Sequence, residues 1–324
     1  MDSRTIRFVM VFFLAGMLSI WLSPVATAAD RVVVVPLGTG GKPLQNVVTV
    51  AKSKGQFTDP VAAMNSIIDA SAANPYLLYI GPGQYTLTTA LIMKPFVDVT
   101  GSGEQATWLM GSISSATMDE TSAIVKGANN AALSNLSVSN TGGGTYSIGI
   151  FNTGLNVTAR LQQLSVYAKG GENNIGVLNY GSSPMTTGLN IAVEGTGTQT
   201  SIGIMNHNSS APTIIGVNVL VWGGNVGVGI YNVTNSVPVI DGANAFVWNG
   251  STGNVGVYNV SSNDVKIRRS TISGTTNGLS NSGSVNTRVS QSTLIGGAAG
   301  GGYTCVASDD NLGHQLTTAT CAFP

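Results

Sequence analysis

The stretch Ile148-Gly149-Ile150-Phe151-Asn152 returns along the chain at a nearly constant spacing. Its later copies keep one glycine between aliphatic residues and end in asparagine: Ile175–Asn179, Ile202–Asn206, Val228–Asn232 and Val255–Asn259. Successive asparagines lie 27, 27, 26 and 27 residues apart, and a weaker copy ends 22 residues later at Asn281. A fixed period of this size is typical of a solenoid, in which each repeat buries its apolar face only by stacking on its neighbours.

A second repeated piece accompanies these copies. It starts with Asn or Gln and continues with alternating apolar residues: Asn135–Val138, Gln163–Val166, Asn190–Val193, Asn218–Val221 and Asn244–Val247. Two or three short strands per coil, with glycine and proline at the corners, predict an all-β parallel β-helix. Leucine-rich repeats are a poor match because their leucine spacing is missing, and the blades of a propeller need longer repeats.

The composition supports a folded solenoid and excludes some partners. Only 9% of the 324 residues are charged, yet 43% are hydrophobic and regularly spaced, which argues against a disordered chain. The formal net charge is zero and no basic patch is present, so nucleic acid is not an expected partner.

Residues 1–28 have the pattern of a secretory signal peptide. Arg4 and Arg7 precede the apolar run Phe8–Leu22, and Ala26-Thr27-Ala28 offers small residues for cleavage. The alternative is a retained membrane anchor, but the run is short for a span, which needs about 20 apolar residues. We therefore expect an exported protein, periplasmic, cell-surface or extracellular, whose mature chain has no membrane span.

Residues 29–75 are expected to form N-terminal strands and a capping helix. The β-branched runs Arg31–Val35 and Val47–Val50 predict strands, and Asp59-Pro60 predicts a helix start. An amphipathic stripe follows, made of Val61, Met64, Ile67 and Ile68. With Asn74-Pro75 as its end, this short helix would cover the open apolar end of the solenoid.

Residues 301–324 contain both cysteines of the chain, Cys305 and Cys321. In an exported protein such a pair most simply forms a disulfide, and closing a loop of this length contributes about 3 kcal/mol on the chain-entropy model. We expect a C-terminal cap pinned by this bond. His314 is near, but His/Cys/Cys is an incomplete ligand set, so no metal site and no cofactor are predicted.

Two segments near the start of the repeats, Gly81–Leu87 and Lys94–Gly103, resemble the opening coils of pectin methylesterase-type proteins. The resemblance covers about residues 45–110 and points to the pectin-lyase-like superfamily. It implies a single-stranded right-handed parallel β-helix, with the repeats at residues 76–300 and a short N-terminal capping helix. It also implies chemistry on polysaccharides.

The catalytic motifs of that superfamily are missing. The Asp and Arg motifs of pectin methylesterases, the two motifs of pectate lyases and two of the four polygalacturonase motifs have no counterpart. Asp309-Asp310 and Gly313-His314-Gln315 echo the other two, which we interpret as coincidence. Glycoside cleavage needs two carboxylates about 5–10 Å apart, and the acids of the repeats share no column. No catalytic residue is predicted.

Residues at equivalent positions of successive coils should stack about 4.8 Å apart. The asparagines that end the repeats, Asn152, Asn179, Asn206, Asn232 and Asn259, are expected to form a structural ladder of amides. Another column, Phe151, Leu178, Met205, Tyr231 and Tyr258, predicts packing, either internal or at an oligomer face.

A further column lies four residues after the Asn/Gln that starts the second piece. It contains Ser139, Tyr167, Glu194, Trp222 and Trp248. If these side chains point outward, Tyr167, Glu194, Trp222 and Trp248 would form a carbohydrate-binding face, because aromatic rings contact the C–H faces of sugars. The alternative is that the tryptophans lie under a loop or at a subunit contact.

The leading hypothesis is therefore a secreted, non-catalytic protein that binds a polysaccharide or cell-surface glycan, or has a structural role at the surface. The alternative is a divergent polysaccharide-active enzyme resembling a pectin esterase, a lyase or a glycoside hydrolase, which depends on fold analogy. A third interpretation is a subunit of a surface assembly, since the outward apolar column is compatible with an oligomer.

Overall fold

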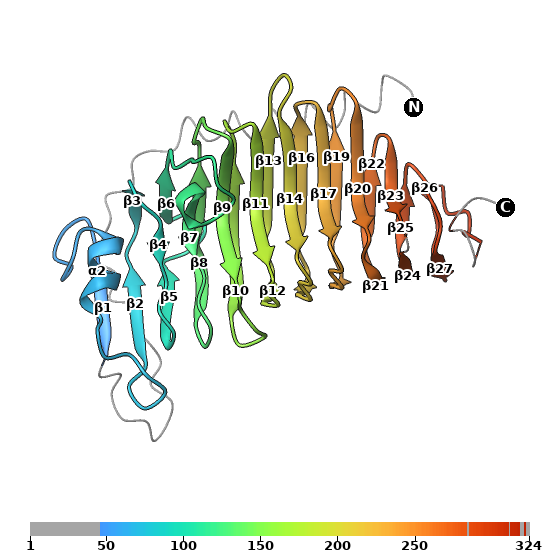
Figure 1. Cartoon of the computed structure of the whole chain (residues 1–324). Helices are drawn as coiled ribbons and strands as arrows, with labels where there is room; N and C mark the ends of the chain where they lie inside the picture. The colour runs from blue at the N-terminus through green and yellow to red at the C-terminus, as the bar shows by residue number, and fades with distance from the viewer. Residues whose placement is uncertain (1–45, 284, 311, 318–320, 322–324) are drawn as a thin grey trace. The chain divides into compact units, whose positions relative to one another are not determined.

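The computed structural model describes residues 46–283, 285–310, 312–317 and 321. The predicted signal peptide at residues 1–28 and the predicted strand Arg31–Val35 lie outside these residues. The described chain is built almost entirely of parallel strands stacked coil upon coil (Figure 1). No helix within the described residues is long and apolar enough to cross a membrane.

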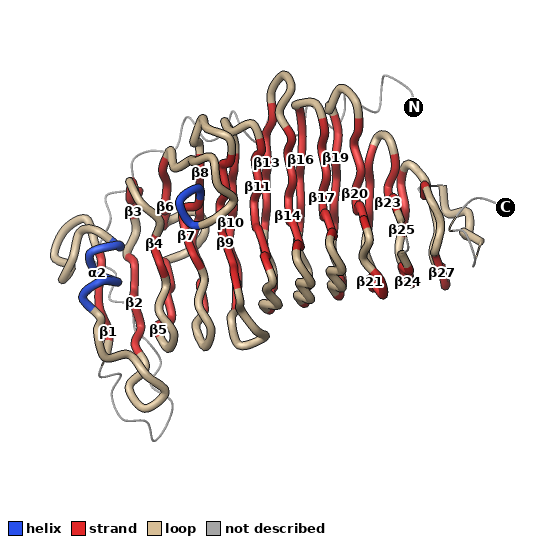
Figure 2. The backbone as a smooth tube through the Cα atoms, in the orientation of Figure 1, coloured by secondary structure: helices blue, strands red, loops and turns tan. Residues whose placement is uncertain are grey.

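The strands form an 18-stranded sheet and a 9-stranded sheet. The larger sheet has two arms, because β8 (Ala132–Asn140) and β10 (Arg160–Ala168) each run through both. We call its arms sheets I and II and the 9-stranded sheet, sheet III. Figure 2 shows the strands as rows joined by short corners.

Sheet I contains the first halves of β8 and β10 together with β1 (Val47–Val50), β2 (Tyr76–Ile80), β5 (Val97–Gly101), β12 (Met185–Thr187), β15 (Thr213–Ile215), β18 (Val239–Asp241), β21 (Asn263–Arg268), β24 (Asn286–Ser290) and β27 (Tyr303–Val306). Sheet II contains the second halves of β8 and β10 together with β3 (Gly83–Thr86), β6 (Thr107–Gly111), β13 (Asn190–Gly195), β16 (Asn218–Gly223), β19 (Asn244–Trp248), β22 (Thr271–Gly274) and β25 (Thr293–Ile295). Sheet III contains β4 (Leu91–Ile92), β7 (Ala123–Lys126), β9 (Tyr146–Thr153), β11 (Asn173–Tyr180), β14 (Thr200–His207), β17 (Val226–Val233), β20 (Gly253–Val260), β23 (Asn277–Ser282) and β26 (Ala298–Ala299).

The corner between sheets I and II is made by one residue per coil in the left-handed region. Successive corner residues are Asn135, Gln163, Gly188, Gly216, Gly242, Arg269 and Gln291, with φ between 46° and 65°. Glycine adopts this conformation without steric cost, and asparagine tolerates it better than most residues. Each corner therefore bends the chain sharply enough to start the next sheet.

The core lies between the three sheets, and alternation along each strand fills it. In β16, Val219 and Val221 are fully buried, while the residues between and around them point outward. The glycine of the repeat lets sheets II and III approach: a Cβ on Gly203 would lie 2.1 Å from Val219 Cγ1 and 2.5 Å from Gly229 O. That crowding is why the aliphatic pattern of the repeat is interrupted by glycine at this position.

The capping helix α2 (Pro60–Ser66) packs Ala63 and Met64 into the core. Asp59 caps it, because its carboxylate accepts from the backbone N of Val61 (3.0 Å) and of Ala62 (3.2 Å). The helix ends at Ser66, well before the predicted end at Asn74-Pro75, since Ile67 is already extended.

Beyond the helix, Lys94 Nζ donates to the backbone O of Ile67 (2.5 Å). This places a positive charge at the C-terminus of the helix, where the helix dipole favours it. Ile68, predicted to belong to the apolar stripe, is 90% exposed, because it follows the end of the helix.

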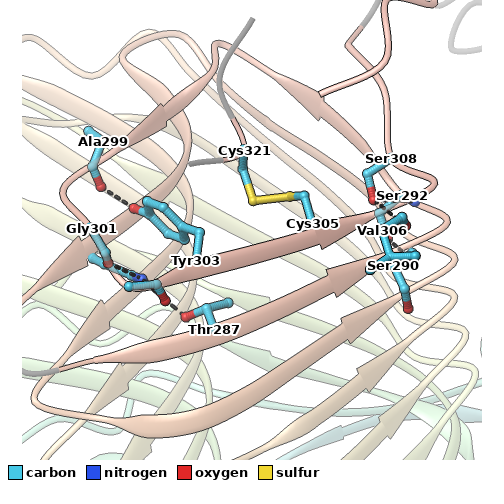
Figure 3. The surroundings of a disulfide bond; sticks show 12 residues. Thr287, Ser290, Ser292, Ala299, Gly301, Tyr303, Cys305, Val306, Ser308 and Cys321 are labelled. Atoms are coloured by element: carbon cyan, nitrogen blue, oxygen red, sulfur yellow. Dashed lines mark hydrogen bonds between the residues drawn. A yellow bond between two sulfur atoms is a disulfide. The ribbon is translucent and has the colours of Figure 1, made fainter. Parts of the chain in front are cut away.

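The C-terminal segment closes the last coils (Figure 3). Cys305 in β27 and Cys321 form a disulfide with their Cα atoms 5.4 Å apart, and both are buried. Next to them the Tyr303 hydroxyl donates to the backbone O of Ala299, and burial raises the pKa of Tyr303 to about 12. The disulfide thus joins the last strand to the tail over the end of the core.

The tail also contains Asp309-Asp310 and Gly313-His314-Gln315, the two segments that are similar to polygalacturonase motifs. Asp310 is 4% exposed and accepts from His314 Nδ1 (2.9 Å) and from the backbone N of Leu312 (2.8 Å) and of His314 (2.7 Å). These bonds hold a turn in the C-terminal tail.

Candidate functional site

The asparagines that end the repeats form a continuous ladder inside sheet III. Each side-chain amide donates to the next carbonyl, at 2.9, 2.8, 2.7, 2.7 and 2.9 Å from Asn152 to Asn281. Asn152, Asn179, Asn206, Asn232 and Asn259 are at most 1% exposed. We call this the inner ladder. Because it is buried, it stabilises the stack of coils and is closed to a ligand.

A second amide ladder lies on the outer face of sheet II. Asn244 Nδ2 donates to Asn218 Oδ1 (3.0 Å), and Asn218 Nδ2 donates to Asn190 Oδ1 (2.9 Å). All three side chains are exposed. We call this the outer ladder. In the sequence these residues only marked the start of the second repeated piece. Their recurrence at one strand position could also have predicted a second ladder.

The outer ladder ends on a carboxylate from another part of the chain. Asn190 Nδ2 donates to Glu104 Oε2 (3.0 Å), and Ser165 Oγ donates to the same oxygen (2.6 Å). Glu104 lies in the loop between β5 and β6, so three coils contribute to this junction. Sequence analysis did not identify Glu104, because 86 residues separate it from Asn190.

The predicted aromatic column needs a correction. Tyr167 pairs with Ala192, not with Glu194, whereas Glu194 pairs with Trp222 and Trp222 with Trp248. The prediction aligned Gln163 with Asn190, but Gln163 is a corner residue and its counterpart is Gly188. The predicted register is therefore wrong by two residues. Because side chains two residues apart point to the same side of a strand, Tyr167 stays on the same face of the sheet, level with Ala192 instead of Glu194.

The aromatic side chains still form one strip on that face. The ring centroids of Tyr167 and Trp222 are 6.5 Å apart and those of Trp222 and Trp248 are 6.0 Å apart, with interplanar angles of 26° and 20°. Such separations fit offset, nearly parallel rings. All three rings are half-buried, so each keeps part of its surface open to solvent.

Polar and charged groups fix the first ring of the strip. The Tyr167 hydroxyl donates to Glu194 Oε2, and burial, then the Glu194 carboxylate, raise the pKa of Tyr167. Lys169 Nζ lies 3.9 Å from Glu194 Oε2 and 5.6 Å from the centroid of the Tyr167 ring. Tyr167 is therefore held as a neutral phenol in a defined orientation.

A groove of about 380 Å³ lies beside this strip on sheet II. Its lining includes Trp108, Ser165, Tyr167, Asn190, Ala192 and Leu220. Ala192 stands between Tyr167 and Leu220 in register, and its small side chain leaves the hollow. Trp108 comes from β6, whose register with the later repeats could not be read from the sequence.

Other features of the described chain are less suited to bind a ligand. A second cavity of about 380 Å³ lies between α2 and the short helix η2 (Glu120–Ser122), and Glu120 there is paired with Lys126 at 3.1 Å. Phe151, Leu178 and Met205 belong to a second apolar cluster of sheet III, separate from the main core. Neither feature places aromatic rings beside an exposed row of asparagines like the outer ladder.

Asp241 and Asp264 are not part of the face. On sheet I, Arg269 binds Asp241 with two hydrogen bonds (2.8 and 2.6 Å) and lowers the pKa of that carboxyl. Asp264 pairs with Lys266 (3.2 Å) and Arg288 (3.0 Å). Among the described residues, no group of three or more His, Cys, Asp and Glu side chains is placed to hold a metal ion.

Comparison with known proteins supports the fold alone. No protein-family model matches the sequence, and no curated protein matches it. A pectin methylesterase from carrot matches the structure with a TM-score of 0.53 and 12% identity, over 84% of this chain and 85% of that chain. A pectin methylesterase from Aspergillus niger, in deglycosylated form, matches with a TM-score of 0.52 and 14% identity, over 82% and 85%. The predicted pectin-lyase-like right-handed parallel β-helix is confirmed.

Proposed function

We propose that the protein binds a polysaccharide along the outer face of sheet II. The observation that carries the proposal is the strip of Tyr167, Trp222 and Trp248 running beside the outer ladder. Sugar rings have apolar C–H faces and polar edges. A strip of aromatic rings next to a row of amides matches both at once.

The repeat supports an extended ligand over a small molecule. Amides and rings recur from coil to coil at the interstrand spacing of about 4.8 Å, so successive units of one chain meet similar groups. Half-buried rings lose little conformational freedom on binding, since packing already restricts them. The groove at Trp108 and Ala192 would seat one sugar more deeply than the open strip does.

The test is binding of a panel of polysaccharides by affinity electrophoresis. A Trp222→Ala/Trp248→Ala variant should bind at least about tenfold more weakly, a loss of about 1.4 kcal/mol. Tyr258→Ala is the matched control, because Tyr258 stacks on Tyr231 (5.4 Å) in sheet III, away from the face. Failure of the native protein to bind any member of the panel, or unchanged binding by the double variant, would refute the proposal.

A polysaccharide-active enzyme is the second candidate. Glu104 and Glu194 each bind a side chain of the outer face of sheet II, and glycoside cleavage uses two carboxylates. The test is release of reducing ends, unsaturated products or methanol from polysaccharides. If activity is found, Glu104→Gln and Glu194→Gln should each abolish it. No product from any substrate would leave binding as the function.

We also propose that the protein is exported. The predicted signal peptide and the disulfide between Cys305 and Cys321 support this, because structural disulfides persist in oxidising compartments. N-terminal sequencing of the protein recovered after expression with its full leader should start near Ala29. Recovery of an intact Met1 in the cytoplasm would contradict the proposal.

A further inference from the structure

Resting on the proposed function, we infer that the ligand is a neutral polysaccharide and not a polyuronate. The outer face of sheet II, which we call the binding face, carries more negative than positive charge near the strip. Among the described residues, the carboxylates of Glu104 and Glu194 and the ammonium of Lys169 are the charged groups with a recorded contact to the side chains of the groove or strip. An acidic sugar chain laid over this face would meet two carboxylates for one ammonium.

The single ammonium is already engaged. Lys169 Nζ lies 3.9 Å from Glu194 Oε2 and 5.6 Å from the Tyr167 ring, so its charge is shared between a carboxylate and an aromatic face. A uronate that approached this ammonium would also approach the carboxylate of Glu194. Recognition of carboxylates usually relies on the planar, two-pronged guanidinium of arginine, which the binding face does not present among the described residues.

The basic side chains of the later coils lie elsewhere. Lys266 and Arg288 belong to β21 and β24 of sheet I, where they pair with Asp264. Arg269 stands at the corner before β22, nearest to sheet II, but its guanidinium binds Asp241 with two hydrogen bonds. These cations therefore neutralise acids of their own sheet.

Neutral sugars match the polar groups that are present. Hydroxyls donate to carboxylate and amide oxygens and accept from amide N–H groups. Glu104 Oε2 accepts from Ser165 and Asn190, while Oε1 makes no hydrogen bond within the described part of the chain. That oxygen can accept a hydrogen bond from a sugar hydroxyl, and the hydrogen bonds from Ser165 and Asn190 hold the carboxylate in place. A uronate at the same place would put two like charges together, which opposes binding.

The experiment compares neutral and acidic chains on the full protein. The neutral ligands are mannan, xylan, β-glucan and chitin oligosaccharides, and the acidic ligands are polygalacturonate and alginate. Each is titrated into the protein at low and high salt, with either EDTA or Ca²⁺. We expect at least one neutral chain to bind about tenfold more tightly than either polyuronate, a difference of about 1.4 kcal/mol. Its affinity should change little with salt, because no ion pair forms.

Two substitutions test the cause. Glu104→Gln and Glu194→Gln keep the size and an acceptor oxygen, and each should raise the affinity for polygalacturonate several-fold, most clearly at low salt. Asp264→Asn is the matched control on sheet I and should leave it unchanged. Thermal unfolding of each variant checks that the fold is retained, and Glu194→Gln alone suffices if Glu104→Gln unfolds.

The outcomes separate this inference from the proposed function. Preference for a polyuronate, with or without Ca²⁺, would overturn the inference and leave polysaccharide binding standing. Absence of binding to every chain would overturn both. Preference for a neutral chain together with the gain in the two glutamine variants would support both.

Discussion

The two asparagine ladders use the same bond in opposite surroundings. In the inner ladder the amides are buried, and Asn179, Asn206 and Asn232 each donate one hydrogen bond to the next asparagine and accept one from the previous asparagine. In the outer ladder Asn190, Asn218 and Asn244 make the same side-chain bonds at 2.9 and 3.0 Å but are exposed. Burial is the difference that decides what each ladder can do.

The difference teaches how one residue type serves both stability and recognition. A buried amide that loses its partner has no water to replace it, so the inner ladder contributes to the stability of the fold. An exposed amide exchanges its partner for water at little cost, so the outer ladder can also exchange it for a sugar hydroxyl. The predictions below test this contrast.

The largest effect is expected for Asn206→Ala in the inner ladder. The change leaves Asn179 Nδ2 without an acceptor and Asn232 Oδ1 without a donor, both buried. Two unsatisfied groups should lower the free energy of unfolding by about 2–4 kcal/mol. Urea unfolding followed by circular dichroism measures this. A change below about 0.5 kcal/mol, the usual range for a surface substitution, would break the contrast.

A smaller loss is expected for Asn152→Ala at the end of the same ladder. Asn152 Nδ2 donates to Asn179 Oδ1, but Asn152 Oδ1 has no partner among the described residues. Only one hydrogen-bonded neighbour is left unpaired, so the loss should be about half that of Asn206→Ala, about 1–2 kcal/mol. The same urea titration gives the ratio, and equal losses at both positions would show that position in the ladder is irrelevant.

Asn218→Ala in the outer ladder should reverse the pattern. Its free energy of unfolding should stay within about 0.5 kcal/mol of the native value, because the side chain is exposed. Its affinity for the polysaccharide should fall about five- to tenfold, a cost of about 1 kcal/mol for one lost hydrogen bond. Affinity electrophoresis and urea unfolding on the same samples separate the two effects. Lost stability with retained binding would contradict both assignments.

The smallest effect concerns pH at His207, which follows Asn206 in β14. Burial lowers the pKa of His207 below its usual value, and its ring stacks on Tyr180 at 5.0 Å. The folded state therefore favours the neutral ring. Its contribution to stability is complete above about pH 6.5 and is lost as the pH falls through the lowered pKa.

The measurement is the melting temperature between pH 7.5 and 5. The native protein should lose slightly more on acidification than His207→Gln, which cannot gain the proton. Identical pH profiles for the native protein and His207→Gln would show that this ring does not contribute.

The repeat made the fold predictable, because residues separated by the length of one coil become neighbours on adjacent parallel strands. Asn179 and Asn206 are in register as the spacing predicts. The register between β10 and β13 was not predictable from residue types. Gln163, which has a left-handed backbone conformation at one corner, corresponds to Gly188 in the next coil. Backbone conformation, and not side-chain type, sets where a strand starts after a corner.

The candidate site was less predictable than the fold. Trp222 and Trp248 could be found from alternation within one repeat. Glu104 and Trp108 could not, because they precede the regular repeats and reach the face through a loop and through β6. Contacts that join distant parts of a chain leave no periodic signal in it.

Each coil of the later repeats pairs only with the coil before it and the coil after it. The molecule can therefore change its length without changing its cross-section. Deleting residues 207–232 would connect Asn206 directly to Val233 and bring Asn206 beneath Asn259. The rod would become shorter by about 4.8 Å, and one asparagine and one tryptophan would leave the binding face together. The reach of the protein along a ligand is in this sense a count of its turns.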